Sequence, residues 1–160
     1  MNDLDELYQV SQAVLSVTRQ MSVRDVLQVI VRSARSLVGA RYAVLAGRAH
    51  GIPVAFTAPD LPELKADQEA ALYRVAQEAL HNALRHSGAG AVCVRLARTA
   101  RRVTLEVADD GHGFAPEAPS GGVGLASMRE RAAHAGGTLT IKSGTQGTLV
   151  RMTVPVPGGG

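Results

Sequence analysis

Four polar residues recur at a spacing that places them together on one face of a helix. Glu78, Asn82, Arg85 and His86 stand at positions i, i+4, i+7 and i+8, which is the repeat of an α-helix. The amide oxygen of Asn82 suits Mg²⁺ when phosphate oxygens and waters complete the coordination. The carboxylate of Glu78 can orient a metal-bound water or accept a proton, and the two basic side chains can meet phosphate charge. Taken alone, the pattern also fits an ordinary amphipathic helix with its polar face in solvent.

A second chemical feature is the run Asp109-Asp-Gly-His-Gly113, which ends a stretch with strand-like alternation. Gly111 and Gly113 allow the backbone to turn sharply and to approach a flat ligand closely. The carboxylate of Asp109 can accept a hydrogen bond from an exocyclic amine, which would select adenine over guanine. An Asp-Gly pair is by itself also a common turn signal.

A third feature is the glycine-rich run Gly121-Gly-Val-Gly-Leu125, which leads straight into a predicted helix. The backbone amides of such a loop attract phosphate together with the helix N-terminus. The run is not a Walker A loop, because no Gly-Lys-Ser/Thr follows, and no βαβ unit surrounds it as in a dinucleotide fingerprint. Each feature is weak alone, but the three in this order indicate a nucleotide pocket and favour ATP.

The elements that must position these residues follow from hydrophobic periodicity. A long helix is predicted from about Glu63 to His86, closed by Gly88 and Gly90. Alternating residues predict two strands joined by a hairpin at 98–102, and a glycine pair ends a later helix. The predicted strands cover 92–97, 103–107, 138–142 and 148–154, and the later helix covers 126–135 after a loop at 116–122. This order predicts an α+β fold, a two-layer α/β sandwich with its helices on one face of the sheet.

The first part of the chain carries two apolar seams at helical spacing, within residues 7–21 and 23–37. Residues 1–38 are therefore predicted to form a helix pair, which either pairs two chains in a homodimer or packs on its own domain. Short strands are expected at 41–46 and 51–56, where Pro53 favours a place at the sheet edge.

Composition narrows the class of protein. An apolar fraction of 46% in 160 residues is enough for a core. No apolar run is long enough for a membrane span, and the acidic N-terminus is unlike a signal peptide, so a cytoplasmic location is expected. A net charge of only +3 with 3% aromatic residues disfavours nucleic-acid binding. The single cysteine, Cys93, excludes an internal disulfide and a cysteine-based zinc site.

Residues 51–157 resemble the ATP-binding catalytic domain of sensor histidine kinases, which has the Bergerat fold with a mixed sheet and belongs to the GHKL (gyrase, Hsp90, kinase, MutL) superfamily. The run Leu72-Tyr-Arg-Val-Ala-Gln-Glu-Ala-Leu-His-Asn-Ala-Leu-Arg-His86 is similar to the N-box of kinases that serve helix-turn-helix response regulators. The run from Gly124 to Ala132, the pair Gly136-Gly137 and the pair Gly147-Thr148 also fit that subfamily.

The resemblance implies a role for each site residue, with ATP and Mg²⁺ as the ligands. Asn82 would bind Mg²⁺ with Glu78 as the base or water-orienting residue, and Asp109 would hold the adenine amine with Thr148 in support. The remaining nucleotide-binding residues would be Arg85 and His86 on the helix, Gly111 and Gly113 at the pocket floor, and Gly122, Gly124 and Leu125 of the lid loop beside the phosphates. Asp110 stands where asparagine is more usual, a change that is expected to be tolerated.

Residues 1–47 resemble the opening of a GAF domain, and this segment and residues 51–157 are the two domains expected. None of the five histidines precedes an acid or lies in a suitable helix before the N-box. The chain is therefore expected to bind Mg·ATP but to lack its own phosphoacceptor histidine helix and not to autophosphorylate alone. It is expected to phosphorylate in trans a histidine-bearing dimerisation domain or a response regulator, to hydrolyse ATP slowly, or to act as a bare ATP-binding module. Two alternatives are an anti-sigma-factor-type serine kinase, which has this fold without a histidine helix, and a non-catalytic ATP-binding dimerisation module.

Overall fold

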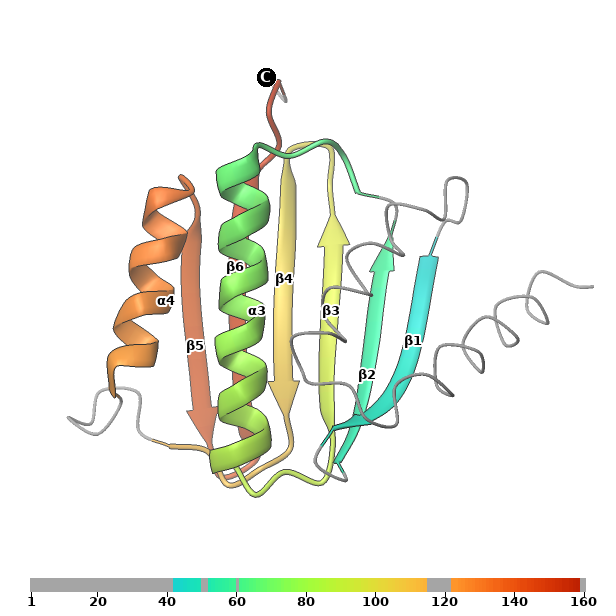
Figure 1. The fold of residues 1–160 in the computed structure, drawn as a ribbon, viewed down its shortest axis with the longest axis vertical. Helices are drawn as coiled ribbons and strands as arrows, with labels where there is room; N and C mark the ends of the chain where they lie inside the picture. Colours follow the sequence, from blue (N-terminus) through green and yellow to red (C-terminus); the bar gives the residue numbers. More distant parts are fainter. Residues whose placement is uncertain (1–41, 50–51, 60, 115–121, 159–160) are drawn as a thin grey trace, which may run out of the picture.

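The computed structural model describes residues 42–49, 52–59, 61–114 and 122–158 (Figure 1). The expected N-terminal helix pair, most of the GAF-like segment and the loop at 116–121 lie outside the described residues. The described elements are β1 (Tyr42–Ala49), β2 (Ile52–Pro59), α3 (Ala66–His86), β3 (Val92–Arg98), β4 (Arg102–Asp109), α4 (Gly122–His134), β5 (Thr138–Gly144) and β6 (Gly147–Pro155).

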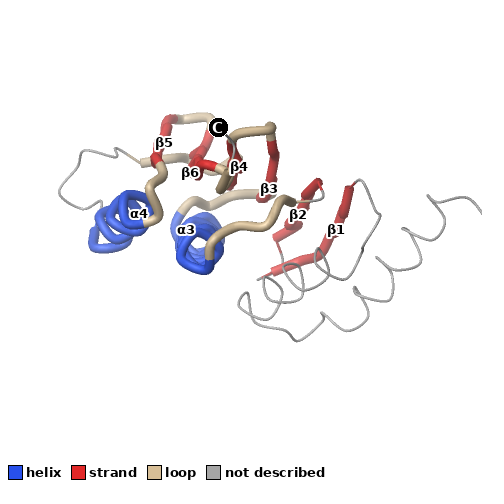
Figure 2. The backbone as a smooth tube through the Cα atoms, turned by 90° about the horizontal axis from the view of Figure 1, so that it is seen from above, coloured by secondary structure: helices blue, strands red, loops and turns tan. Residues whose placement is uncertain are grey.

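The six strands form one mixed sheet in the order β1-β2-β3-β4-β6-β5. Strands β2 and β3 are parallel, and every other neighbouring pair is antiparallel. Both helices lie on the same face of this sheet, as Figure 2 shows. The predicted α+β sandwich with helices on one face is thus confirmed.

Strand β2 corrects one expectation, because it lies between β1 and β3 and not at the sheet edge. Proline is nevertheless tolerated at position 53. Pro53 pairs with Arg48 of β1, whereas the register between β2 and β3 begins only at Val54. The missing N–H of the proline therefore falls where no β3 partner is present.

Helix α3 begins at Ala66, three residues later than predicted, and a side chain of its first turn bonds back to the residue before it. The backbone N–H of Lys65 donates to Oε1 of Gln68 at 3.1 Å, which satisfies one of the donors left free at a helix start. The buried amide Nε2 of Gln68 donates to the carbonyl of Pro155 at 2.8 Å and ties the helix to the end of β6. The helix ends as predicted at His86, and Gly88 follows with a φ of 63°.

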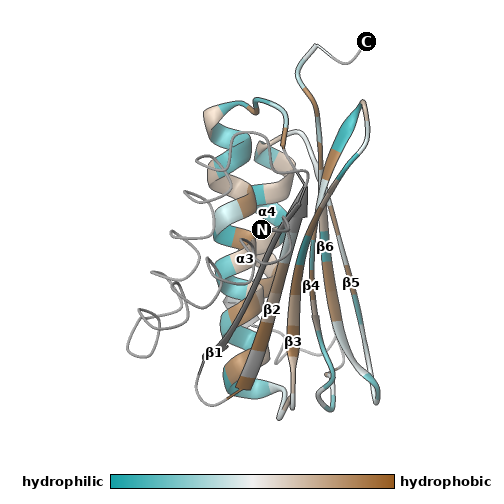
Figure 3. Ribbon diagram, turned by 90° about the vertical axis from the view of Figure 1, so that its right-hand side faces the viewer, coloured by the Kyte–Doolittle hydropathy of each residue, from teal (hydrophilic) through white to brown (hydrophobic). Residues whose placement is uncertain are grey.

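The core lies between the sheet and the two helices (Figure 3). Alternate residues of β3, β4 and β6 point into it, as the burial of successive residues shows. The largest fully buried side chains are Met128, Met152, Val75, Val94, Val103 and Val154. None of the helices among the described residues is long and apolar enough to cross a membrane.

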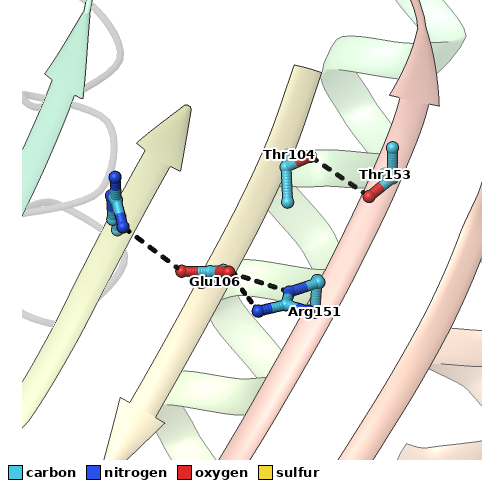
Figure 4. A network of polar contacts seen from close by, with 5 residues as sticks. Thr104, Glu106, Arg151 and Thr153 are labelled. Carbon is cyan, nitrogen blue, oxygen red and sulfur yellow. Dashed lines mark hydrogen bonds and ion pairs between the residues drawn. The ribbon is translucent and has the colours of Figure 1, made fainter. Parts of the chain in front are cut away.

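The opposite face of the sheet carries polar side chains (Figure 4). Glu106 of β4 accepts a hydrogen bond from Nε of Arg151 at 2.8 Å and lies 4.0 Å from Arg95 of β3. The hydroxyls of Thr104 and Thr153 are 3.2 Å apart on the same two strands, β4 and β6. Exposed ion pairs of this kind contribute little to stability, so the helix-covered face holds the sheet in place.

Candidate functional site

A cleft of about 300 Å³ opens between the second half of α3, the start of α4, the end of β4 and the start of β6. The turn after β4 forms one side. The lining residues are Ala79, Asn82, Ala83, His86, Ser87, Val107, Asp109, His112, Gly113, Phe114, Leu125, Met128, Thr148 and Val150. The structure therefore brings six of the predicted site residues to one cleft: Asn82, His86, Asp109, Gly113, Leu125 and Thr148.

The floor of the cleft is apolar. Ala79 and Ala83 of α3 are buried and carry only a methyl group, which leaves space between the helix and the sheet. Val107 and Val150 come from adjacent strands and stand opposite each other in the β4–β6 register. An apolar floor with a few polar groups at its rim is typical of small-molecule sites and suits a flat aromatic base.

Asp109 is the last residue of β4 and is half-buried at the rim. Its Oδ1 accepts a hydrogen bond from the backbone N–H of Gly111 at 2.9 Å. Within the described part of the chain, its Oδ2 has no hydrogen-bond partner. Thr148, which is buried, stands directly opposite Asp109 in the β4–β6 register. The two side chains thus offer an acceptor and a hydroxyl at the same end of the cleft.

Glycine is required at positions 111 and 113 because the loop packs against the chain's own backbone. A Cβ atom at Gly111 would lie 2.2 Å from the carbonyl oxygen of Ser87, at the end of α3. A Cβ atom at Gly113, whose φ is +69°, would lie 2.1 Å from the carbonyl oxygen of Gly144. The loop is therefore held between α3 and the β5–β6 turn, which positions Asp109.

The polar face of α3 divides between the cleft and the solvent. Asn82 and His86 line the cleft, and the ring of His86 meets that of His81 with centroids 6.3 Å apart. Glu78 lies one turn earlier, beside Gly124 of α4, where a Cβ atom would be 2.4 Å from its Oε1. Arg85 is exposed and is not among the residues that line the cleft.

The glycine-rich run differs from the expectation for its local structure. Gly122 and Gly124 lie in the first turn of α4, which begins at Gly122 and not at residue 126. Because Gly124 has no side chain, the first turn of α4 can lie against Glu78, and Leu125 turns into the cleft. The free backbone amides of a helix start therefore lie near the polar face of α3.

The described chain matches one known family over most of its length. Residues 67–158 match the family described as histidine kinase-, DNA gyrase B-, and HSP90-like ATPase. The chain belongs to this family.

Within this family, the relatives with the most similar sequences include sensor kinases. The chain is 42% identical over 96 residues to the signal transduction histidine-protein kinase/phosphatase UhpB of Salmonella typhimurium, a match that covers 60% of this chain and 19% of UhpB. It is 44% identical over 96 residues to the sensor histidine kinase MctS of Rhizobium johnstonii, covering 58% of this chain and 21% of MctS. It thus spans about a fifth of the length of these curated relatives.

A solved structure has a similar fold. Full-length ShkA in complex with AMPPNP superposes with a TM-score of 0.59 at 26% identity, covering 84% of this chain and 30% of ShkA. The chain therefore contains the ATP-binding catalytic domain of a sensor histidine kinase, with the fold that the resemblance implied.

Three polar or aromatic residues line the cleft but are not among the site residues predicted from the sequence. Ser87 follows α3 and accepts a hydrogen bond on its carbonyl from the N–H of His112 at 2.9 Å. His112 lies between the two glycines of the Asp-Gly motif, and its Nδ1 is 2.8 Å from the carbonyl oxygen of Gly113. Phe114 is 39% exposed, and it is the one exposed large hydrophobic residue among those whose burial the structure describes. Its place directly after the motif is the signal that could have identified it.

Asp110 does not line the cleft, and its carboxylate instead binds backbone N–H groups. Its Oδ1 accepts hydrogen bonds from the backbone N–H groups of Gly90 at 2.8 Å and Ala91 at 2.9 Å. The bond from Ala91 and then that from Gly90 hold the pKa of this carboxyl below its ordinary value. The carboxylate thereby fastens the segment between α3 and β3 to the loop after β4.

Proposed function

We propose that this chain binds Mg²⁺·ATP in the cleft and serves as the phosphate-transferring domain of a two-component kinase. The observation that carries the proposal is that the two carboxylate oxygens of Asp109 have different surroundings. One of its oxygens is held by Gly111, while the other is open toward a ligand. An acceptor fixed in this way pairs with the exocyclic amine of adenine and meets an oxygen of guanine unfavourably.

The apolar floor and the start of α4 support ATP as a whole ligand. The base fits between the alanines of α3 and the valines of the sheet. The phosphates would extend toward Asn82, His86 and the first turn of α4, where free amide groups favour negative charge. AMPPNP, which is bound in the ShkA structure, is an analogue of ATP.

The residues of the cleft fit Mg²⁺ only together with a nucleotide. No group of three or more histidine, cysteine or acidic residues that could hold a metal is present among the described residues. The amide oxygen of Asn82 is instead a single hard ligand at the cleft, which suits an ion that retains waters and phosphate oxygens. Bound Mg²⁺ would neutralise phosphate charge, and Glu78 would orient a water or accept a proton beside it.

The acceptor of the phosphoryl group lies on another segment or chain. We assign this role to a histidine-bearing dimerisation domain, from which a response regulator receives the phosphate. The relatives UhpB and MctS are named as histidine kinases and are several times longer than the matched region. Residues 1–38 remain a proposed homodimer contact, and the helix-turn-helix subfamily and the GAF-like segment likewise remain proposals.

Calorimetric titration with ATP and GTP, each with and without Mg²⁺, tests this function. We expect ATP to bind, Mg²⁺ to tighten it, and GTP to bind much more weakly. Asn82→Ala should lose the effect of Mg²⁺ while keeping metal-free ATP binding, because the base side is unchanged. Equal affinity for ATP and GTP would reject the assignment of Asp109, and a full Mg²⁺ effect in the Asn82 variant would reject its metal role.

A further inference from the structure

Ser143, near the end of β5, joins two parts of the cleft through one oxygen. Its Oγ accepts a hydrogen bond from the backbone N–H of Phe114 at 2.8 Å. The same Oγ lies 2.7 Å from Oγ1 of Thr148, its partner in the β5–β6 register. Ser143 itself does not line the cleft, so any effect on a ligand must pass through Thr148 and Phe114.

The position of Thr148 makes this link relevant to base recognition. Thr148 is only 8% exposed, lines the cleft, and stands opposite Asp109 in the neighbouring strand. A hydroxyl has one hydrogen to donate and can also accept. Whether Thr148 presents its hydrogen or its lone pair to the cleft depends on which of the two hydroxyls donates in the Ser143–Thr148 pair.

The hydrogen-bonding groups of adenine require one of these two orientations of the Thr148 hydroxyl. Its base-pairing edge carries a donor amine beside an acceptor ring nitrogen, N1, whereas guanine carries an acceptor oxygen beside a donor N–H. With Asp109 accepting from the amine, the matching group at N1 is a donor. Thr148 can donate toward N1 only when Ser143 supplies the hydrogen of the hydroxyl pair. The N–H of Phe114 already occupies one of the two lone pairs of Ser143 Oγ, and the hydroxyl hydrogen of Ser143 stays free to point at Thr148.

We propose that Ser143 is a positioning residue that orients the Thr148 hydroxyl as a donor to N1 of adenine. Asp109 and the Ser143–Thr148 pair then read both groups of the adenine edge, and guanine is mismatched at both. This inference rests on the proposed ATP function and adds a specificity determinant to it.

The test compares ATP with 1-deaza-ATP, in which a C–H group replaces N1. Wild-type protein should bind 1-deaza-ATP about fivefold to tenfold more weakly than ATP, as expected for one lost hydrogen bond. Ser143→Ala should bind ATP more weakly by a similar factor and should discriminate much less between the two nucleotides. Ser143→Thr keeps a hydroxyl and should retain the discrimination of the wild type.

A matched control lies on the other face of the sheet. Thr104→Val removes one hydroxyl of the Thr104–Thr153 pair, which also bridges two neighbouring strands but faces away from the cleft. It should leave both affinities unchanged. A purely structural role of Ser143 would weaken ATP and 1-deaza-ATP equally and would preserve their ratio.

The outcomes separate this inference from the function on which it rests. If the wild type binds ATP but Ser143→Ala discriminates between the two nucleotides as well as the wild type does, the positioning role is wrong and the ATP function stands. If the wild type does not bind ATP at all, the proposed function fails and the inference fails with it.

Discussion

At the scale of single residues, neighbouring aspartates of one motif perform different tasks. Asp109 directs one oxygen to Gly111 and leaves the other open at the cleft, whereas Asp110 directs Oδ1 to two backbone N–H groups away from the cleft. Both bonds to Asp110 reach a single oxygen, so the amide oxygen of an asparagine can accept both. This explains in physical terms why an acid is acceptable where the family more often has asparagine.

The open oxygen of Asp109 predicts a large effect of Asp109→Asn on ATP binding. The amide oxygen of the variant would keep the N–H of Gly111, so its NH₂ group would face the amine of adenine, donor against donor. We expect a loss of about 2 kcal/mol, or roughly 30-fold in Kd, by calorimetry. Asp110→Asn is the matched control and should bind ATP as the wild type does. Unchanged affinity in Asp109→Asn would contradict the contact with the base.

Asp110 predicts a dependence of stability on acid pH. Its folded-state pKa lies below the ordinary value of 3.8 because Ala91 and Gly90 donate to the carboxylate. The stability from this group is therefore fully present above pH 3.8 and is lost as the pH falls through the lowered pKa. Asp110→Asn should unfold at a lower temperature than the wild type at pH 7, and the difference should shrink below about pH 4.

Thermal unfolding between pH 3 and pH 7 measures this difference. Glu130→Gln is a control, because Glu130 is an exposed carboxylate of α4 that lies 3.9 Å from Nε2 of His134 and far along the chain from the loop after β4. It should follow the pH profile of the wild type. A constant difference between Asp110→Asn and the wild type at all pH values would contradict the electrostatic explanation.

At the scale of elements, the cleft depends on how the loop after β4 packs against the β5–β6 turn. A Cβ atom at Gly113 would meet the carbonyl of Gly144, and one at Gly147, whose φ is +123°, would lie 1.9 Å from the carbonyl of Asp109. These contacts bring the backbones of two turns together without intervening side chains. The geometry of Asp109 and Thr148 therefore depends on glycine positions at which a side chain would collide with backbone.

Two glycines with similar φ test this packing. Gly113 has a φ of +69° and faces backbone, whereas Gly136 has a φ of +68° and has nothing within 4 Å of its Cβ position. Gly136→Ala should cost only the backbone strain of about 1 kcal/mol. Gly113→Ala should cost clearly more in denaturant unfolding and should weaken ATP binding, because the loop must move. Equal costs for the two variants would show that the contact with Gly144 does not constrain the loop.

At the scale of the whole molecule, the described histidines lie on α3, on α4 and in the loop after β4, which surround the cleft, and not on a separate acceptor helix. His86 and His112 line the cleft itself, and His134 is exposed at the end of α4. We therefore predict that the 160-residue chain incubated with radiolabelled ATP and Mg²⁺ acquires no acid-labile phosphate. Label should appear on an added histidine-bearing dimerisation domain.

The stability of the label separates the kinase classes in that experiment. Acid-labile label on the chain itself, abolished by Asp109→Asn, would contradict the prediction, since an acceptor would then be present. Acid-stable label on an added protein would favour the serine-kinase alternative over histidine transfer.

Much of the fold and of the candidate site was predictable from local pattern. The helical repeat ending at His86 and the alternation in 92–97 and 103–107 involve near neighbours in the chain, and these elements formed where expected within a few residues. The start of α4 was less predictable. Glycine disfavours helix interiors, so the run from Gly122 to Gly124 predicts a loop. In the structure these residues are helical, and the missing side chain of Gly124 lets the first turn of α4 pack against Glu78.

Residue types and short spacings were enough to predict the kinds of element, the family, and the residues with the chemistry for an adenine nucleotide. Which of these residues meet depends on contacts between distant parts of the chain. The register that sets Thr148 opposite Asp109, the exclusion of Arg85 from the cleft, and the link of Ser143 to Phe114 join positions far apart in the chain. Such contacts arise from burial of the sheet against α3 and α4, and local periodicity carries no information about them.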